Sequence, residues 1–343
     1  MRIGPAEIAP HAAPLLIAEI GVNHDGDARR AIELTDAAAA AGAAAVKVQF
    51  FRADRLLSKR SMLAGYQRRA GETSALEMLR RLELTPSDLA RVAERARAHG
   101  LAAICTCFTP ELVDEAEAIG FDAYKVASPD VVNRLLLERL AETKRPMILS
   151  TGAATLDELD RSMGWLDAAR SRLALMQCVS AYPTPEGDAN LAAIRLLGER
   201  FGCPVGYSDH TEATDTGALA VAAGATFLEK HLTHDRSAAG PDHAASLEPE
   251  SFAEYARLAR RARAMLGAGG KALSELESDV RSLSRQSLAL RAPVRAGEVV
   301  TRDLLTTRRP GDAMAASAPE RACGRPAARD LAAGELLEEG DLV

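Results

Sequence analysis

The sequence lacks long apolar runs, an excess of basic charge and a nucleotide-binding signature. No run approaches the length of a membrane span, and the opening MRIGPAEIAPHAAP has neither the basic start nor the apolar core of a signal peptide. The formal net charge of -6 argues against a nucleic-acid footprint. No GxGxxG or Walker motif is present. We therefore expect a cytoplasmic protein that binds neither membranes nor nucleic acids.

Cysteine is scarce and scattered. The 343 residues include 5 Cys, an odd number that suits reduced thiols rather than a disulfide framework. Cys105 and Cys107 would share one face of a strand, because side chains alternate along it. We interpret them as small buried hydrophobic side chains, with metal ligation as the alternative.

Eight short apolar runs alternate with amphipathic stretches. The runs are 15–20, 44–51, 101–108, 123–128, 147–152, 173–178, 204–209 and 226–231. Several intervening stretches open with a Thr or Asp suited to a helix N-cap and close on Gly. This alternation predicts an α/β fold, and eight units match a (β/α)₈ TIM barrel, with a doubly wound sheet as the alternative. Segment 52–85 is expected to be a long loop carrying a helix.

The composition changes after Leu266. The glycine-rich GAGGKALSELESD predicts a linker, so we expect a catalytic barrel at 1–266, a linker at 267–285 and a small β-rich domain at 286–343. Within that domain RAGEVVTRDL (295–304) recurs as AAGELLEEGDL (332–342). The repeat predicts a compact module with approximate twofold symmetry.

Polar residues stand at the C-terminal end of nearly every apolar run. They are Glu19, Lys47, Gln49, Thr106, Lys125, Ser128, Ser150, Thr151, Ser180, Tyr182, Ser208, His210, Glu229 and His231. Each alone has a structural explanation as a strand-end cap or turn former. In a barrel, however, these ends converge on one mouth, where active sites lie. The run LEKH is therefore expected to be the eighth strand reaching that mouth.

Two kinds of chemistry are indicated at these ends. His210 and His231 end successive runs, and paired imidazoles suit Mn, Zn, Fe or Co; the alternative is two hydrogen-bonded structural histidines. Asp209 and Glu229 beside them would serve equally as salt-bridged structural groups. A phosphate site of cations and hydroxyls is the second indication, and a structural carboxylate partner for the lysines is its alternative. Its members would be Lys47, Lys125, Ser128, Ser150 and Ser208.

A family resemblance follows from these motifs. IAEIGVNHDGD, AGAAAVKVQFF, YKVAS, ILSTGAATLDEL, CVSAYPTPEGDANL, GYSDHT and EKHLTHDRSAAGPDHAASLEP stand here in the order and spacing typical of one family. The chain resembles the N-acetylneuraminate (sialic acid) synthase family, which includes legionaminic and pseudaminic acid synthases. Its tail, with RRPG at 308–311, resembles that family's antifreeze-like (SAF) domain.

The resemblance implies a transferase. Members condense phosphoenolpyruvate with an N-acetylated mannosamine-type sugar and release phosphate by metal-assisted cleavage of a C–O bond. The product is a 2-keto-3-deoxy nine-carbon sugar acid, and the acceptor would be N-acetylmannosamine or a 2,4-diacetamido-trideoxy hexose. Two alternatives remain: a pyruvate-using metal-dependent aldolase, and a non-catalytic sugar-acid-binding protein on the same fold.

Residue roles carry over where the motifs match. By resemblance His210 and His231 would bind a divalent metal, with Mn²⁺ expected and Mg²⁺ or Co²⁺ as alternatives. Phosphoenolpyruvate would be held by Lys47, Thr106, Lys125, Ser128, Ser150 and Ser208. The sugar and the reacting centre would be faced by Glu19, Tyr182, Glu229 and Asp242. Arg309, from the partner in a domain-swapped homodimer, would reach the N-acetyl end of the sugar.

The chain also departs from the family pattern. Ser128-Pro129-Asp130 replaces the usual SGE, and Ala153 replaces the Met of STGM. Ser180 stands where sialate-forming members carry an amide near the pyruvate. The segment AGETSALEML has no match for an Asn that contacts the sugar in those members. CVSAYP is closer to the legionaminic and pseudaminic branches, so the resemblance fixes the reaction better than the acceptor.

Overall fold

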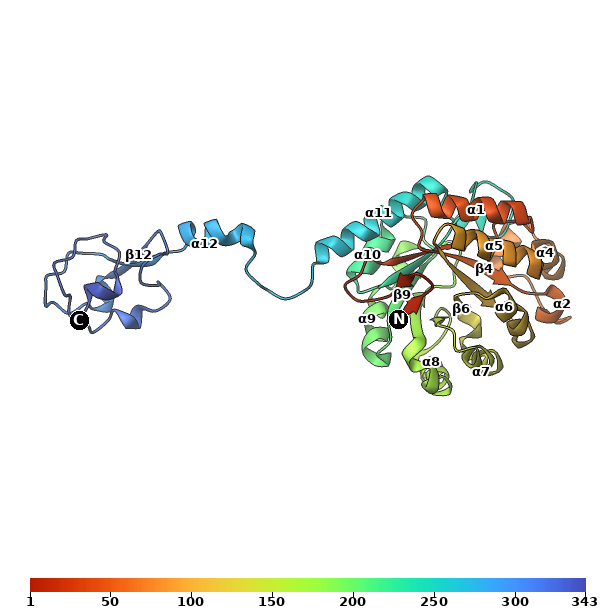
Figure 1. Cartoon of the computed structure of the whole chain (residues 1–343), viewed down its shortest axis with the longest axis horizontal. Helices are drawn as coiled ribbons and strands as arrows, with labels where there is room; N and C mark the ends of the chain where they lie inside the picture. Colours follow the sequence, from red (N-terminus) through yellow and green to blue (C-terminus); the bar gives the residue numbers. More distant parts are fainter. The chain divides into compact units, whose positions relative to one another are not determined.

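A closed barrel of eight parallel strands forms the larger of two compact units, Met1–Ala268 and Gly269–Val343 (Figure 1). The computed structural model describes all 343 residues apart from the side chains of Tyr66 and Arg69. The strands follow the order β10-β3-β4-β5-β6-β7-β8-β9, which confirms the predicted barrel and excludes a doubly wound sheet. Their bounds are β3 (Leu15–Glu19), β4 (Ala45–Phe50), β5 (Ala102–Cys107), β6 (Ala123–Val126), β7 (Met147–Ser150), β8 (Leu173–Cys178), β9 (Val205–Asp209) and β10 (Phe227–His231).

Helices surround the strands (Figure 1). They are α1 (Ala28–Ala40), α5 (Pro86–Ala98), α6 (Val113–Ile119), α7 (Arg134–Glu142), α8 (Leu156–Trp165), α9 (Ala192–Phe201), α10 (Thr216–Ala222) and α11 (Pro249–Leu266). Thr85 and Thr155 cap α5 and α8 in reciprocal capping boxes, which satisfy amide groups that the first helical turn leaves free. Gly120 ends α6 with φ 81°, a conformation that disfavours side chains with a Cβ. The predicted Thr and Gly signals are therefore confirmed at these termini.

Short helices fill the remaining connections. Segment 52–85 carries three of them rather than the single helix that was predicted, namely α2 (Ala53–Leu56), α3 (Gly65–Arg69) and α4 (Ala75–Leu82). Met78 and Leu82 of α4 pack with Val22 and Phe51, which anchors the segment beside the barrel. The 3₁₀ turns of this unit are Pro110–Leu112, Ser128–Val132, Asp167–Arg172, Glu186–Asp188 and His243–Ala245.

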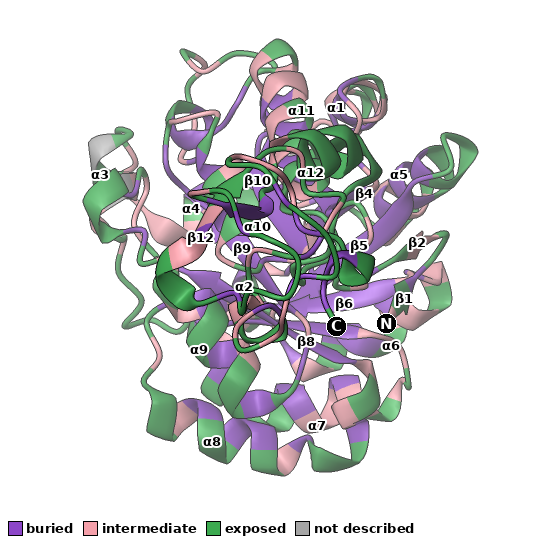
Figure 2. Ribbon diagram, turned by 90° about the vertical axis from the view of Figure 1, so that its left-hand side faces the viewer, coloured by how far each residue is buried: buried purple, intermediate pink, exposed green. Residues whose placement is uncertain are grey.

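Two apolar layers build the core of the barrel unit. The larger lies between strands and helices, where buried residues concentrate (Figure 2). Cys105 and Cys107 lie in it with their sulfurs 3.8 Å apart, which agrees with their interpretation as small buried side chains. The smaller layer fills the barrel interior at its floor. An unpredicted hairpin of β1 (Arg2–Ile3) and β2 (Ala6–Glu7) contributes Ile3 to that floor.

The smaller unit has its own core. Its elements are the 3₁₀ turn Glu275–Glu277, α12 (Ser278–Ser284), β11 (Ser287–Leu290), β12 (Leu305–Arg308) and the 3₁₀ turns Arg302–Leu304, Pro319–Arg321 and Glu339–Asp341. The two sequence repeats adopt the same order of features. Gly297 and Gly334 have φ 82° and 85°, and the buried Val300 and Leu337 follow them, each before a 3₁₀ turn. The segment 267–285, predicted as a linker, contains the helix α12, which is mostly exposed to solvent.

Candidate active site

The C-terminal ends of the barrel strands enclose a hollow of about 330 Å³. Most of the predicted site residues line it. They are Lys47, Thr106, Lys125, Ser128, Ser180, Tyr182, His210, Glu229, His231 and Asp242. All but Asp242 and Tyr182 come from a barrel strand or lie within two residues of its C-terminal end, so they meet at one mouth.

Three predicted residues lie behind this lining. Glu19 is fully buried and forms an ion pair with Lys47. Ser150 accepts a hydrogen bond from Ser128 Oγ at 2.9 Å, and Ser208 Oγ donates to Glu229 Oε1 at 3.2 Å. Each of these three side chains therefore holds a residue that lines the hollow, namely Lys47, Ser128 and Glu229. Arg309 follows β12 in the smaller unit, where it is exposed.

Gln49, one of the polar strand-end residues expected at the mouth, also lines the hollow. The hollow contains five residues that no site prediction included, namely Ala64, Phe108, Ala127, Pro129 and Cys178. Cys178 stands two residues before Ser180, so strand alternation could have placed it inward. Ala64 comes from the segment after β4, and nothing in its local pattern marks it.

Two lysines and two carboxylates form an ionic network in the hollow. Lys125 Nζ lies 3.1 Å and Lys47 Nζ 3.5 Å from Glu229 Oε1. Lys47 also pairs with Glu19, its cross-strand neighbour, and donates to Thr106 Oγ1 at 3.4 Å. Buried charges are costly unless paired, and this network pairs them while leaving Glu229 Oε2 without a hydrogen bond from the described residues.

The two carboxylates differ in their pKa. Burial raises the pKa of Glu19 to about 7, against the lowering effect of the Lys47 charge. Burial acts on Glu229 in the same direction, but the charges of Lys125 and Lys47 outweigh it and lower its pKa to about 2. Glu229 is therefore ionised at neutral pH, whereas Glu19 can carry or release a proton.

Hydroxyl groups line the side of the hollow formed by β6, β7 and β8. Ser128 Oγ accepts a hydrogen bond from the Gly152 amide at 3.1 Å. A Cβ on Gly152 would lie 2.5 Å from Ser180 Oγ and 2.9 Å from Ser128 Oγ, so only glycine lets the backbone approach both hydroxyls. With Lys125 nearby on β6, this side presents hydroxyl and amide donors beside a cation, a combination suited to an anionic oxygen.

The opposite side carries the two predicted imidazoles. The rings of His210 and His231 have centroids 5.5 Å apart, and Tyr182 lies 4.1 Å from His210. His210 Nδ1 is 2.9 Å from the Val179 carbonyl oxygen, so it carries the proton and leaves Nε2 as the electron-pair donor. Burial holds the pKa of His231 well below its usual range, so this ring is neutral.

These residues fit a divalent metal with an incomplete protein ligand set. Among the described residues, none donates a hydrogen bond to or accepts one from the buried His231 Nδ1, which lies 3.9 Å from Asp242 Oδ2. No group of three or more His, Cys, Asp or Glu side chains in the described part of the chain could hold a metal alone. A metal bound by the two imidazoles would therefore take its other ligands from substrate or water.

The run LEKH divides between two faces of β10. Glu229 and His231 point into the hollow, but Lys230 points away and pairs with Asp209 on the outer face. The expectation that this run forms the eighth strand and reaches the mouth is confirmed, and Lys230 faces outward because the side-chain period of a strand is two. Of the structural alternatives weighed for Asp209 and Glu229, the salt bridge holds for both.

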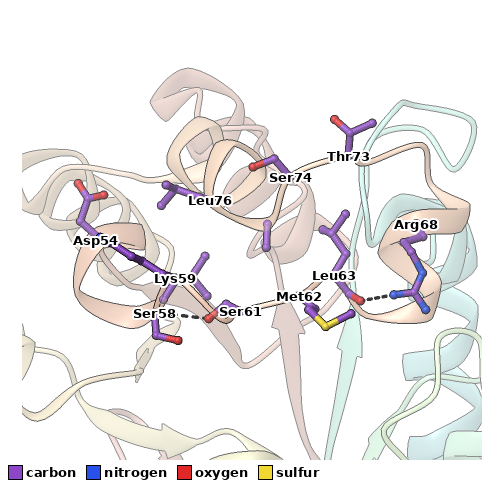
Figure 3. Close-up of a pocket in the computed structure, with 12 residues that line it drawn as sticks. Asp54, Ser58, Lys59, Ser61, Met62, Leu63, Arg68, Thr73, Ser74 and Leu76 are labelled. Atoms are coloured by element: carbon purple, nitrogen blue, oxygen red, sulfur yellow. Dashed lines mark hydrogen bonds between the residues drawn. The ribbon is translucent and has the colours of Figure 1, made fainter.

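A larger hollow, of about 540 Å³, lies in the segment after β4 (Figure 3). Lys59, Arg68 and several hydroxyl side chains line it, and Arg68 Nη1 donates to the Leu63 carbonyl oxygen at 2.5 Å. Its lining comes from residues 54–76 alone and includes none of the predicted site residues. The smaller hollow at the strand ends therefore carries the chemistry.

Comparison with known proteins places the chain in a family. Residues 34–271 match the NeuB family, and residues 285–343 match the SAF domain. A relative from Campylobacter jejuni, N,N'-diacetyllegionaminic acid synthase, is 35% identical over 95% of this chain and 99% of its own. The enzyme of the same name from Legionella pneumophila is 37% identical over 94% and 92%.

A solved structure agrees with this result. The crystal structure of N-acetylneuraminic acid synthetase from Leptospira borgpetersenii, in complex with citrate, superimposes with a TM-score of 0.75 at 31% identity over 82% of this chain and 94% of its own. The chain belongs to the NeuB family, and it is an enzyme of the nonulosonic acid synthase class with a C-terminal SAF domain. In the part of the chain that the structure describes, no helix has the length and apolar character needed to cross a bilayer.

Proposed function

We propose that the protein condenses phosphoenolpyruvate with an N-acetylated mannosamine-type sugar and releases inorganic phosphate. The observation that carries this proposal is the division of one hollow into two sides. Lys47 and Lys125 with hydroxyl donors form one side, and His210 and His231 form the other. Family membership supports the same reaction.

Phosphoenolpyruvate would bind on the lysine side. The phosphate and carboxylate of this substrate carry several negative charges, and they would take over the cations that now pair with Glu229. Ser180 would donate a hydrogen bond, and Ser128 would do so once its hydroxyl hydrogen turns from Ser150 to the substrate. Ser208, which donates to Glu229, would fix that carboxylate. Thr106 would orient Lys47, whose ammonium donates to its hydroxyl.

The sugar would bind on the histidine side. His210 and His231 would hold a divalent metal, with Mn²⁺ expected and Mg²⁺ or Co²⁺ as alternatives. Such an ion supplies a Lewis acid that offsets negative charge on the oxygen of the open-chain aldehyde. Tyr182 and Asp242 line the same side and would orient the sugar, which brings its carbonyl carbon against C3 of phosphoenolpyruvate.

Glu19 would manage the proton of the attacking water. The carboxyl lies behind Lys47, which pairs with its Oε2, while its Oε1 accepts a hydrogen bond from the Gly21 amide at 2.7 Å. Carbon–carbon bond formation leaves positive charge at C2 of the former phosphoenolpyruvate, and an ionised Glu19 would stabilise it or deprotonate the water that adds there. Collapse of the resulting tetrahedral centre then expels phosphate toward Lys47 and Lys125.

We propose a 2,4-diacetamido-trideoxy hexose as the acceptor, with N-acetylmannosamine as the alternative. Both relatives named above are N,N'-diacetyllegionaminic acid synthases, and Ser180 lines the hollow where sialate-forming members carry an amide. The deciding experiment offers a panel of 2-acetamido and 2,4-diacetamido sugars with phosphoenolpyruvate and identifies products by mass spectrometry. A nine-carbon keto acid from the diacetamido sugar alone supports the proposal, and turnover of N-acetylmannosamine alone overturns the acceptor assignment.

The same assay separates the rival reactions. A pyruvate-using aldolase would release no phosphate, and a non-catalytic binding protein would give no product. With phosphoenolpyruvate labelled with ¹⁸O at the bridging oxygen, addition of water at C2 sends the label into inorganic phosphate. Label in the keto acid instead would contradict cleavage of the C–O bond.

A further inference from the structure

A buried ion pair lies directly behind the two candidate metal ligands. Asp209 and Lys230 have side chains that are 0% and 1% exposed, with Lys230 Nζ 3.2 Å from Asp209 Oδ2. They are cross-strand partners in the register of β9 and β10. Each immediately precedes an imidazole in the chain, because His210 follows Asp209 and His231 follows Lys230.

The pair also forms hydrogen bonds with Thr211, the residue that follows His210. Asp209 Oδ1 accepts hydrogen bonds from both the amide and the hydroxyl of Thr211, each at 2.8 Å. Lys230 Nζ donates to the Thr211 carbonyl oxygen at 2.5 Å. One charge cluster therefore holds the residues on either side of His210, and its cation belongs to the residue before His231.

Two helices enclose this cluster. Lys230 Nζ lies 5.5 Å from the ring centroid of Tyr255 on α11, within the range of a cation–π contact. Gly217 on α10 faces the same ring, where a Cβ would approach Tyr255 Cζ to 2.4 Å, so only glycine lets the helices pack here. Thr216 Oγ1 lies 2.9 Å from Thr211 Oγ1 and extends the cluster to α10.

Stability alone does not account for charges at this position. The helices and strands around Lys230 provide an apolar layer, and replacing a buried ion pair with packed neutral side chains is often neutral or stabilising. The ion pair forms directional bonds between β9 and β10 at the level of the two imidazoles. Apolar side chains in the same place would not form such bonds.

We propose that Asp209 and Lys230 are positioning residues that set the separation of His210 and His231 for a shared divalent cation. This inference rests on the proposed metal site. Neither residue lines the hollow, and the pair acts through the backbone on both sides of His210 and through the end of β10. Residues behind metal ligands that fix ligand orientation typically change metal affinity 10–100-fold when removed.

The test measures Mn²⁺ binding without turnover. The double variant Asp209→Asn/Lys230→Met removes both charges together, so no lone buried charge remains. We expect the Kd for Mn²⁺, measured on metal-free protein by electron paramagnetic resonance of the free ion, to rise about tenfold or more. The Kd for phosphoenolpyruvate, from calorimetry, should stay within about twofold because the lysine side is untouched.

Two further variants complete the design. Tyr124→Phe removes a partly buried hydrogen bond, 2.6 Å long, from a β6 residue to Glu117, away from the imidazoles, and should leave Mn²⁺ affinity unchanged. Lys230→Arg keeps the positive charge but replaces the compact ammonium with a planar guanidinium, and it should weaken Mn²⁺ binding several-fold. This variant tests the inference if the double variant does not fold.

The outcomes separate the inference from the proposed function. If wild-type protein binds Mn²⁺ and every folded variant binds it equally well, the positioning role is wrong and the metal site stands. Parallel loss of Mn²⁺ and phosphoenolpyruvate binding would reveal a general structural role and would also overturn the inference. If wild-type protein binds no Mn²⁺ and His231→Ala keeps full activity, the metal site fails and the inference fails with it.

Discussion

The floor and the mouth of the barrel are built by the same strands but have opposite character. At the floor, Ile17, Ala45 and Phe227 are completely or almost completely buried in an apolar layer. Two residues further along the same three strands stand Glu19, Lys47 and Glu229, which are ionisable and equally buried. The packing environment is similar, but the free energy of burial differs in sign.

This contrast separates stability from function. Burial of apolar side chains at the floor stabilises the barrel, whereas burial of the charged layer costs free energy that pairing only partly offsets. The chain's own N-terminal hairpin adds Ile3 to the floor cluster, while the mouth keeps its 330 Å³ hollow. A layer that costs stability and encloses space is best explained by substrates that complete it.

The largest expected effect is at the mouth and concerns the metal. Removal of divalent ions by a chelator, or the substitution His231→Ala, should lower kcat by about a thousandfold or more, because a Lewis acid contributes several kcal/mol to such a reaction. Mn²⁺ should restore the chelated wild type and not the variant. The circular dichroism spectrum should stay native in both cases. Full activity of His231→Ala would refute the metal assignment.

At the floor the effect should fall on stability. Phe227 is fully buried, and its ring fits the space left by Gly206, where a Cβ would come within 2.5 Å of it. Phe227→Ala should lower the free energy of unfolding by about 3–5 kcal/mol in urea denaturation, with activity per folded molecule nearly retained.

Glu19→Gln is the matched control for the floor variant. It keeps side-chain volume at the mouth and removes the carboxylate, so activity should fall at least about a hundredfold. Stability should fall by less than in Phe227→Ala, because Lys47 still pairs with Glu229. Equal losses of stability in both variants would contradict the division between the layers.

Much of this arrangement was predictable from sequence. The eight apolar runs correspond to the eight barrel strands, with ends displaced by no more than two residues, and polar residues at their ends meet in one hollow. These predictions succeeded because a local alternation of apolar strand and amphipathic helix restricts the fold strongly. The site predictions that concern ligand roles stay predictions.

Other features depend on tertiary packing and had no local signal. Ala64 reaches the hollow because α4 packs beside the barrel through Met78, an interaction between distant segments. The hairpin β1–β2 is too short for a periodicity to show.

The mouth should also be the more pH-sensitive region. His24, in the loop after β3, is buried; its Nδ1 accepts a hydrogen bond from the Gly26 amide at 3.1 Å, and burial lowers its pKa to about 4. The folded state keeps the ring neutral while the unfolded chain takes up a proton below its pKa of 6.5. The contribution of the neutral His24 to the free energy of unfolding is therefore fully present above pH 6.5. It is lost as pH falls toward 4, which lowers the free energy of unfolding by up to about 3 kcal/mol.

The variant His24→Asn isolates this effect. An amide oxygen can accept the same backbone hydrogen bond but does not titrate. Urea denaturation at a series of pH values from 7.5 to 4.5 should therefore show a shallower loss of stability in the variant than in wild type. Identical slopes would assign the pH dependence to other groups.

The smallest expected effect tests whether the mouth is completed from outside the barrel. Arg309 is exposed, follows β12 and precedes Pro310 and Gly311, so its backbone is restricted. An exposed Arg before Pro and Gly is ordinarily a solvated turn residue. Family resemblance instead implies that it reaches the sugar of the partner subunit. Arg309→Ala should then lower kcat/KM toward the sugar by about 1–3 kcal/mol, as for a lost charged hydrogen bond, with the KM for phosphoenolpyruvate unchanged.

An arrangement in trans has a sharper consequence. His231→Ala keeps Arg309, and Arg309→Ala keeps His231, so a heterodimer of the two contains one intact site. Mixed in equal amounts under conditions that exchange subunits, the variants should recover about a quarter of wild-type sites. Sedimentation should show a dimer before and after mixing, and subunits with different affinity tags would report exchange independently. If exchange is complete and sugar turnover does not rise above that of Arg309→Ala alone, Arg309 acts in cis or has no role in the site.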